Sequence, residues 1–259
     1  MAISRIKEVN RIKKILVILV CLLLAGCWTV PPEPSGITYR AFFVGVGRYE
    51  NGWTLPSPVG NTNKLEDLFL QCKFGKEEIE FEIIEKLTNY EATKENILNG
   101  IVSTFAETDE NDVSYFYYMG HGGVQGGIPI ITPTDYPTVI TVHELEEYLS
   151  MIPGTKIVLL ETCHAGNFID KGMDFSLDLL NKEGYQVLAS SAGSEYTWDS
   201  IYGSFFCKHL IEGCTDLQAD NNEDGIVDIS ELYQYIKVNV TRQTVQVYPN
   251  GSTFPVAEY

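Results

Sequence analysis

The stretch VSYFYYMGHGG, residues 113–123, places a continuous apolar run directly before a histidine that is flanked by glycines. A second stretch, KIVLLETCHAG at residues 156–166, does the same with a cysteine. Apolar runs of about four to eight residues that end at glycine are typical of strands buried on both faces of a parallel sheet. Because ligands of open α/β sheets meet the carboxyl ends of the strands, the two stretches predict His121 and Cys163 at one functional edge.

Further strands and helices alternate around these two stretches. The expected strands are residues 39–47, 81–87, 113–119, 156–161 and 185–189, and the expected helices are residues 63–72, 93–105, 141–151, 205–211 and 232–240. The third helix opens with Thr141 three residues before Glu144, the pattern of a capping box. This alternation predicts an α/β sandwich with a mainly parallel sheet and right-handed crossovers.

Composition and charge narrow the class of protein. The 259 residues are 44% hydrophobic and 12% aromatic, which excludes disordered, collagen-like and disulfide-framework proteins. Lys and Arg total 18 against 35 Asp and Glu, a formal net charge of −17. Since nucleic-acid binding rests on basic side chains that meet phosphates, this balance argues against a nucleic-acid partner and favours cations or basic peptides.

The amino terminus reads as an export signal. Residues 1–26 combine a basic start with an apolar run of about a dozen residues, shorter than the roughly 20 that a membrane span needs. Leu24-Ala25-Gly26-Cys27 resembles the bacterial lipobox, which implies a lipoprotein signal peptide cleaved before Cys27 and a lipid on that residue. An ordinary signal peptide or a buried apolar strand are the alternatives.

The expected domain organisation follows from this signal. The proline-rich residues 27–36 predict an extended tether, and residues 37–259 predict the folded domain. We therefore expect an exported protein that a lipid anchors to a bacterial membrane, in the periplasm or at the cell surface.

Cysteine and histidine at two strand ends suit nucleophilic catalysis. A thiol attacks a carbonyl as thiolate, so it needs an imidazole that takes its proton and later returns it to the leaving group. Adjacent glycines allow close approach and direct backbone N–H groups at a developing oxyanion. The separation of 42 positions from His121 to Cys163 leaves room for one crossover with its helix. A buried structural cysteine and a structural histidine are the alternative reading.

These segments resemble the histidine and cysteine segments of caspase-like and metacaspase-like peptidases, the peptidase C14 family. Residues 40–47, 187–191 and 203–206 resemble other parts of that family, so the likeness covers about residues 39–240. The resemblance implies a caspase-like three-layer sandwich with a mainly parallel central sheet. It also implies Cys163 as nucleophile, His121 as general base and acid, and an oxyanion hole from the N–H groups of Gly122 and Cys163. Met119, Thr162 and Ala165 stand where the family has serine.

The resemblance also implies a substrate-binding acid at Glu161, two residues before the cysteine. A buried carboxylate there would pair with Arg or Lys, so we expect cleavage after basic residues. A structural role, in which the carboxylate of Glu161 accepts a hydrogen bond from a neighbouring loop, is the alternative. The resemblance places the family's second acid in the segment Asn61-Thr62-Asn63, where this chain has asparagine, whereas Glu195 and Asp199 are candidates for further subsites.

A calcium loop is predicted near the carboxyl end, at residues 220–231. The segment matches the twelve-residue EF-hand template, with a glycine at the sharp turn and a closing glutamate. The expected ligands are the side chains of Asp220, Asn222, Asp224, Asp228 and Glu231 and the carbonyl of Ile226. A solvated acidic turn is the alternative. We expect Ca²⁺ to be structural or regulatory, with no cofactor required for the chemistry.

The remaining cysteines and histidines are expected to be structural. Cys207 and Cys214 lie seven residues apart along one helix, too far for a disulfide between them. His164 is the rival base, but a side chain next to the nucleophile in sequence usually points elsewhere. His143 and His209 fall inside expected helices.

Together these features predict a cysteine-type endopeptidase that uses a Cys–His dyad and a thioester acyl-enzyme, with a preference for basic residues before the scissile bond. Its expected partners are a peptide or protein substrate and, through the lipid, a membrane. The alternative is a catalytically inactive calcium-binding surface lipoprotein that acts in recognition or adhesion.

Overall fold

The structure, a computed structural model, describes residues 36–170 and 179–259. The predicted signal peptide, Cys27 and all of the tether except Gly36 lie outside these residues. Residues Ile37–Tyr259 form one compact unit. In the part of the chain that the structure describes, no helix has both the length and the apolarity needed to cross a membrane.

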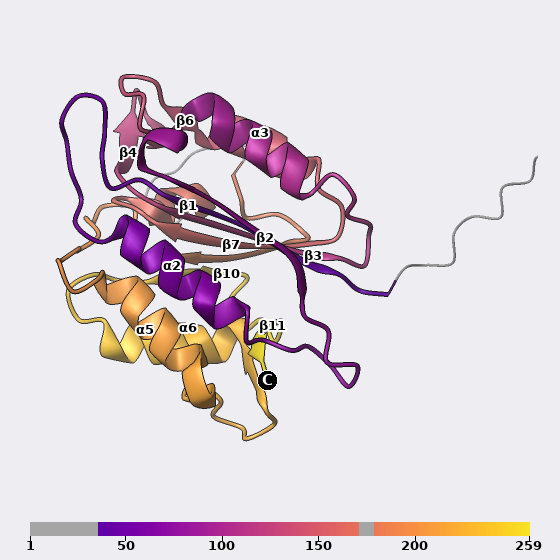
Figure 1. The fold of residues 1–259 in the computed structure, drawn as a ribbon. Coiled ribbons are helices and arrows are strands. Elements are labelled where there is room, and N and C mark those ends of the chain that lie inside the picture. The colour runs from indigo at the N-terminus through magenta and orange to yellow at the C-terminus, as the bar shows by residue number, and fades with distance from the viewer. Residues whose placement is uncertain (1–35, 171–178) are drawn as a thin grey trace, which may run out of the picture. The chain divides into compact units, whose positions relative to one another are not determined.

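A six-stranded sheet organises the molecule (Figure 1). In spatial order its strands are β10 (Gln246–Tyr248), β8 (Tyr185–Ala189), β7 (Thr155–Glu161), β3 (Val113–Met119), β1 (Tyr39–Gly45) and β2 (Phe81–Thr88). Five of them run parallel, and β10 pairs antiparallel with β8 at one edge. The prediction of a mainly parallel sheet is therefore confirmed.

Helices cover both faces of this sheet and complete the three layers. On one face lie α2 (Pro58–Phe69), α5 (Phe205–Cys214) and α6 (Ile229–Asn239), and the other face carries α3 (Lys94–Thr104) and α4 (Val142–Ser150). The central strand β3 serves both layers because its side chains alternate. Tyr115 and Tyr117 pack in the core under α2 and α5, whereas Phe116 and Tyr118 pack in the core under α3 and α4.

Two helices begin earlier than the sequence pattern indicates. Helix α2 opens at Pro58, whose fixed φ suits a first helical position, five residues before the expected start. Its first turns bury the polar side chains of Asn61 and Thr62, which the apolar periodicity does not reveal. Helix α6 begins at Ile229 because Asp228 forms a capping box with Glu231.

Short strands and turns escape prediction from the sequence. An antiparallel sheet of β4 (Gly122–Gln125), β5 (Ile128–Ile131) and β6 (Ile140–Thr141) follows His121 directly. Gly126 and Gly127 turn β4 into β5 with φ of 60° and 87°, values that favour glycine. The other short elements are β9 (Ile226–Asp228), β11 (Pro255–Glu258), η1 (Asn89–Glu91), η2 (Ala165–Ile169) and η3 (Thr215–Leu217).

Candidate functional site

The register of two parallel strands brings the predicted histidine and cysteine to one edge. Met119 in β3 pairs with Glu161 in β7, and both chains leave the sheet there. His121 and Cys163 each follow two residues later, and the N–H of Gly120 donates to the carbonyl of Glu161 at 3.3 Å. His121 and Cys163 line one cavity of about 320 Å³. The crossover between adjacent strands therefore places an imidazole and a thiol at the same opening.

The two loops approach so closely that only glycine fits at one position. A Cβ atom on Gly122 would lie 2.2 Å from Oγ1 of Thr162 and 2.7 Å from the carbonyl oxygen of Ile130. Gly122 follows His121, and Thr162 precedes Cys163. The side chain of Thr162 thus leaves no room for a side chain at position 122, and the two loops that carry the candidate catalytic groups are packed against each other.

An aromatic shell holds His121. Its backbone N–H donates to the hydroxyl of Tyr49 at 2.6 Å, and its carbonyl accepts from the hydroxyl of Tyr118 at 2.7 Å. The imidazole lies 4.9 Å from the ring of Tyr49 and 5.4 Å from that of Trp53, measured between centroids. Burial among these groups lowers the pKa of His121 below its ordinary value. At neutral pH the imidazole is therefore uncharged and able to accept a proton.

The thiol of Cys163 is half-buried at the cavity. Burial raises its pKa, and a hydrogen bond from the backbone of Thr197 partly opposes this rise. At neutral pH the sulfur therefore carries its proton. A neutral thiol opposite a neutral imidazole suits proton transfer during attack better than a resting ion pair.

Hydroxyl groups fix the backbone just before the cysteine. The carbonyl of Thr162 accepts from the hydroxyls of Ser190 at 3.3 Å, Ser191 at 3.2 Å and Thr197 at 2.7 Å. These donors come from the end of β8 and the loop after it. They immobilise the turn that presents Cys163 to the cavity.

His164 makes structural contacts and does not face the cavity as a base would. It adopts a left-handed conformation with φ of 61°, and its Nδ1 lies 2.9 Å from the carbonyl oxygen of Gly193. Its backbone N–H donates to the carbonyl of Glu195 at 2.8 Å. His164 therefore ties the cysteine turn to the next loop and is not among the residues that line the cavity.

Glu161 lies buried on the wall of the same cavity. It accepts from the hydroxyl of Tyr117 at 2.7 Å and, more weakly, from the N–H of Cys207 at the start of α5. The hydroxyl of Ser204 adds a third hydrogen bond. Burial nevertheless dominates and raises the pKa of Glu161 to about 7.

Asp199 supplies a second acid to this cavity. Its carboxylate accepts from both the hydroxyl and the N–H of Ser57. Asn61 donates to Ser57 at 3.2 Å and to Ser204 at 3.0 Å. Glu195 instead binds the N–H and hydroxyl of Thr244 and is not a cavity residue. The acids at the cavity are thus Glu161 and Asp199.

Aromatic side chains form the rim of the cavity, and the sequence patterns did not predict them there. Tyr196 and Trp198 line the cavity and remain 68% and 48% exposed. The guanidinium of Arg242 lies over the ring of Trp198, 5.3 Å from its centroid. An apolar rim above two acids suits a substrate segment that combines an apolar stem with a cationic end.

The predicted calcium loop bends around its own oxygens. The carboxylate of Asp220 accepts from the N–H of Glu223 at 2.8 Å and of Gly225 at 2.9 Å, and Gly225 takes a φ of 88°. Asn222 accepts from the N–H of Asp224 at 2.9 Å. The turn expected of the template is therefore present in the backbone.

The carboxylates of this loop are engaged in hydrogen bonds. Glu231 accepts from the N–H groups of Asn221 at 3.0 Å and Asp228 at 3.2 Å. Within residues 36–170 and 179–259, no group of three or more His, Cys, Asp and Glu side chains is placed to hold a metal ion. As placed here, the acidic side chains do not form a metal centre, and calcium would require Glu231 to turn away from its capping contacts.

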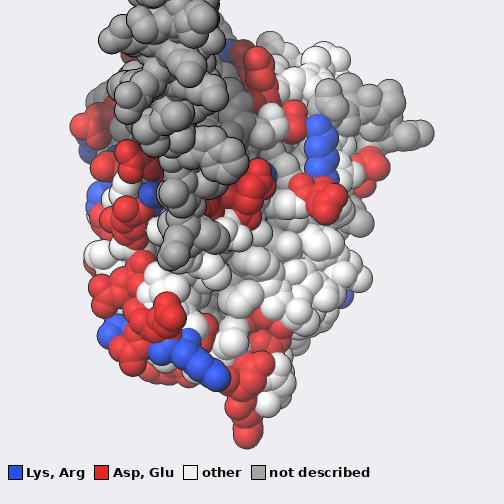
Figure 2. All heavy atoms as spheres, turned by 90° about the vertical axis from the view of Figure 1, so that its right-hand side faces the viewer, with Lys and Arg blue, Asp and Glu red and all other residues white. Residues whose placement is uncertain are grey.

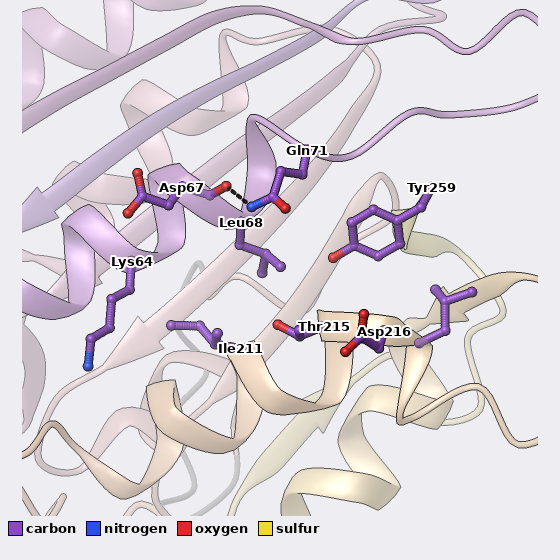
Figure 3. A pocket seen from close by; sticks show the side chains of 9 residues that line it. Lys64, Asp67, Leu68, Gln71, Ile211, Thr215, Asp216 and Tyr259 are labelled. Atoms are coloured by element: carbon purple, nitrogen blue, oxygen red, sulfur yellow. Dashed lines mark hydrogen bonds between the residues drawn. The ribbon is translucent and has the colours of Figure 1, made fainter.

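The other thiols and a larger cavity lie away from this edge. Cys72, Cys207 and Cys214 are free and buried. A cavity of about 630 Å³ opens between α2 and the end of α5, and its lining includes Lys64, Asp67, Thr215, Asp216 and Tyr259 (Figure 3). Neither His121 nor Cys163 lines it, so it is separate from the candidate active site.

We expect Gly122→Ala to lower both stability and activity. The new methyl group meets the side chain of Thr162 and the backbone of Ile130, and such overpacking costs about 1 to 3 kcal/mol. The matched control is Gly123→Ala, whose added Cβ meets nothing within 4 Å. Urea unfolding and peptide hydrolysis measure both effects. Equal midpoints for the two variants would contradict the close contact of the loops.

Comparisons with known proteins agree with this architecture. The family of the caspase domain, Peptidase C14, matches residues 38–257. Metacaspase-1 of Plasmodium falciparum is 26% identical over 157 residues, which cover 53% of this chain and 25% of that protein. Metacaspase-1 of Schizosaccharomyces pombe is 24% identical over 188 residues, which cover 64% of this chain and 44% of that protein. The chain thus spans less than half the length of these curated relatives.

Solved structures show the same fold. A protein from Geobacter sulfurreducens superposes with a TM-score of 0.64 at 15% identity, over 85% of this chain and 97% of that one. Caspase-1 from Spodoptera frugiperda superposes with a TM-score of 0.59 at 14% identity, over 84% of this chain and 87% of that one. The sheet order and the position of His121 and Cys163 after two paired strands agree with the family match on residues 38–257. The chain belongs to the caspase domain family, Peptidase C14.

Proposed function

We propose that this protein is a cysteine endopeptidase in which Cys163 is the nucleophile and His121 the general base and acid. The observation that carries the proposal is that these two residues leave paired strand ends and line one cavity. Membership of the caspase domain family supports it. The neutral states favoured by burial for both groups fit a base that takes the thiol proton as attack begins.

The proposed reaction has two halves. In the first, the imidazole removes the thiol proton, the sulfur adds to the peptide carbonyl, and the N–H groups of Gly122 and Cys163 bind the oxyanion. The C–N bond then breaks, and His121 returns the proton to the leaving amine. In the second half, His121 takes a proton from water, the resulting hydroxide attacks the thioester, and the released thiolate regains a proton.

We further propose that the enzyme prefers Arg or Lys before the scissile bond. Glu161 and Asp199 supply acids to the cavity that also holds Cys163. The chain carries a formal net charge of −17. Acidic side chains also gather on the face in Figure 2, which views the molecule from the amino ends of the parallel strands, opposite the candidate site. Such a field attracts cationic peptides, and the buried acid discriminates among them.

The proposed activity is tested with fluorogenic peptides that end in Arg, Lys or Asp. We expect hydrolysis after Arg and Lys and little after Asp, since a substrate carboxylate would face Glu161 and Asp199. Absence of hydrolysis with every peptide would contradict the proposed activity and favour an inactive binding protein. Faster cleavage after Asp would contradict the proposed preference alone.

Cleavage after Arg should increase as the pH rises through about 7. The raised pKa of Glu161 means that its carboxyl group is neutral below that value and charged above it. Glu161→Gln removes the charge, so we expect kcat/KM for Arg peptides to fall about 30-fold at pH 8 and the pH dependence of the Arg-to-Ala preference to flatten. Glu107→Gln, at an exposed acid, is the control. An unchanged preference in Glu161→Gln would contradict the assignment.

We also propose that the loop at residues 220–231 binds Ca²⁺ as a structural ion, on the basis of its sequence and its turn. The proposed ligands are the side chains of Asp220, Asn222, Asp224, Asp228 and Glu231 and the carbonyl of Ile226. Bound there, calcium would join the loop to the start of α6. No step of the proposed reaction needs it.

Calcium at millimolar concentration should raise the thermal midpoint by about 5 °C over a chelated sample, because the ion would bind the folded chain alone. Glu231→Gln should abolish this shift while it keeps the helix cap, since glutamine also completes a capping box. Differential scanning calorimetry makes the comparison. Equal midpoints with calcium and with chelator would contradict calcium binding.

For localisation, we propose that residues 1–26 direct export and that a lipid on Cys27 retains the protein at a bacterial membrane. The basic start of the chain, the length of the apolar run and the sequence Leu-Ala-Gly-Cys support this localisation.

A further inference from the structure

A second cavity adjoins the candidate active site at His121. It measures about 330 Å³ and is lined by Trp53, Thr54 and His121. Among the described residues, the cavity that holds Cys163 and Glu161 shares His121 with it. The imidazole therefore borders two cavities. One contains the nucleophile and two acids, and the described residues that line the other include no Asp, Glu, Lys or Arg.

A turn stabilised by backbone hydrogen bonds places the indole of Trp53 at this second cavity. Arg48 and Thr54 pair as an antiparallel bridge, and the N–H of Tyr49 donates to the carbonyl of Trp53 at 3.1 Å. The indole packs against the ring of Tyr136, with centroids 4.8 Å apart, and meets the edge of His121. Trp53 is still 47% exposed, so a large apolar face is fixed in place beside the imidazole.

We propose that this second cavity receives the side chain that follows the scissile bond and selects an aromatic or other large apolar residue there. The inference rests on the proposed function. A general acid protonates the leaving nitrogen, so the residue that carries this nitrogen lies beside His121. The acids lie in the cavity that holds Cys163, where the acyl half of the substrate is bound. The enzyme thus selects substrates with a basic residue before the scissile bond and an apolar residue after it.

Capture of the acyl-enzyme by added amines tests this inference independently of acylation. A peptide that ends in an arginine coumarylamide forms the thioester on Cys163, and either water or an amino-acid amide then resolves it. The amine nitrogen attacks the thioester carbonyl and the C–S bond breaks. The proton lost by the amine returns to the sulfur through His121. The ratio of peptide amide to free acid, measured by mass spectrometry, reports how well each amine occupies the second cavity.

Phenylalanine amide should capture the acyl group at least about tenfold better than alanine amide, the discrimination expected of an apolar pocket. Trp53→Ala should bring this ratio close to one, and Trp53→Phe should retain most of it. Tyr90→Ala removes another exposed aromatic ring, which lines neither cavity, and should leave the ratio unchanged. Because the ratio is taken within each variant, a general loss of rate does not affect it.

The outcomes separate this inference from the proposed function. Release of coumarin with equal capture of both amides would overturn the inference and leave the peptidase intact. A preference for phenylalanine amide that persists in Trp53→Ala would also overturn it. If no coumarin is released and no acyl-enzyme forms, the proposed function fails and the inference fails with it.

Discussion

Cys163→Ala should lower kcat/KM for arginine peptides by at least about 10³-fold, because no other described group at the cavity can form the thioester. The thiol is only half-buried, so the unfolding midpoint should change little. Initial rates with the arginine coumarylamide and thermal unfolding measure the two quantities.

Cys72→Ala is the matched control for this prediction. Cys72 is a buried thiol that packs in the core with Leu65 and Phe69, away from the cavity. Its removal should lower stability and spare activity, the opposite pattern to that of Cys163→Ala. If Cys163→Ala retained activity within a factor of ten, the nucleophile would have to be a different group.

His121→Gln should reduce kcat by about 10² to 10⁴-fold, the range that a general acid–base group contributes. The control is His164→Gln, since His164 is adjacent to the nucleophile but bound to the carbonyl of Gly193. That variant should retain activity within about tenfold. A larger loss of kcat in His164→Gln than in His121→Gln would show that His164, and not His121, is the general base.

The role of His121 as general base also predicts how the rate of hydrolysis decreases at low pH. Protonated imidazole cannot accept the thiol proton, so the rate should fall as the pH falls through the pKa of His121. Because burial lowers that pKa, this fall should lie below the ordinary histidine value of about 6.5, and it is measured in Glu161→Gln, which lacks the titration of Glu161 near pH 7. When His121→Gln is combined with Glu161→Gln, this limb should disappear.

The sequence predicted the elements whose apolar pattern is continuous. Strand β3 begins and ends where the aromatic run at residues 113–119 does, and β8 coincides with residues 185–189. The capping box at Thr141 likewise marked the start of α4. In each case a local signal, a buried run or a cap, is sufficient to define the element.

Elements that depend on contacts distant in sequence were not predicted. The first turns of α2 bury Asn61 and Thr62, and Asn61 is satisfied by Ser57 and Ser204, the latter 143 positions away. Strands as short as β6 have too few residues for a pattern to emerge. The Gly126–Gly127 pair between Val124 and Ile128 was the one local signal for the hairpin of β4 and β5.

For the site, the sequence named the residues at the two strand ends, but not the groups that surround them. The sequence indicates Asp199 only as a candidate for a further subsite, because its position at the cavity depends on its hydrogen bond with Ser57. Trp53 was not singled out, since only the fold brings its turn to His121. The raised pKa of Glu161 also arises from burial that the sequence alone does not reveal.

Alkylation of the protein by a peptide chloromethyl ketone that ends in arginine tests most directly whether His121 activates Cys163. Mass spectrometry identifies the modified residue and the rate of its modification at pH 7. We predict a single adduct on Cys163, formed at least about 100-fold faster in the wild type than in His121→Gln. An adduct on another cysteine, or equal rates in the two proteins, would contradict the account.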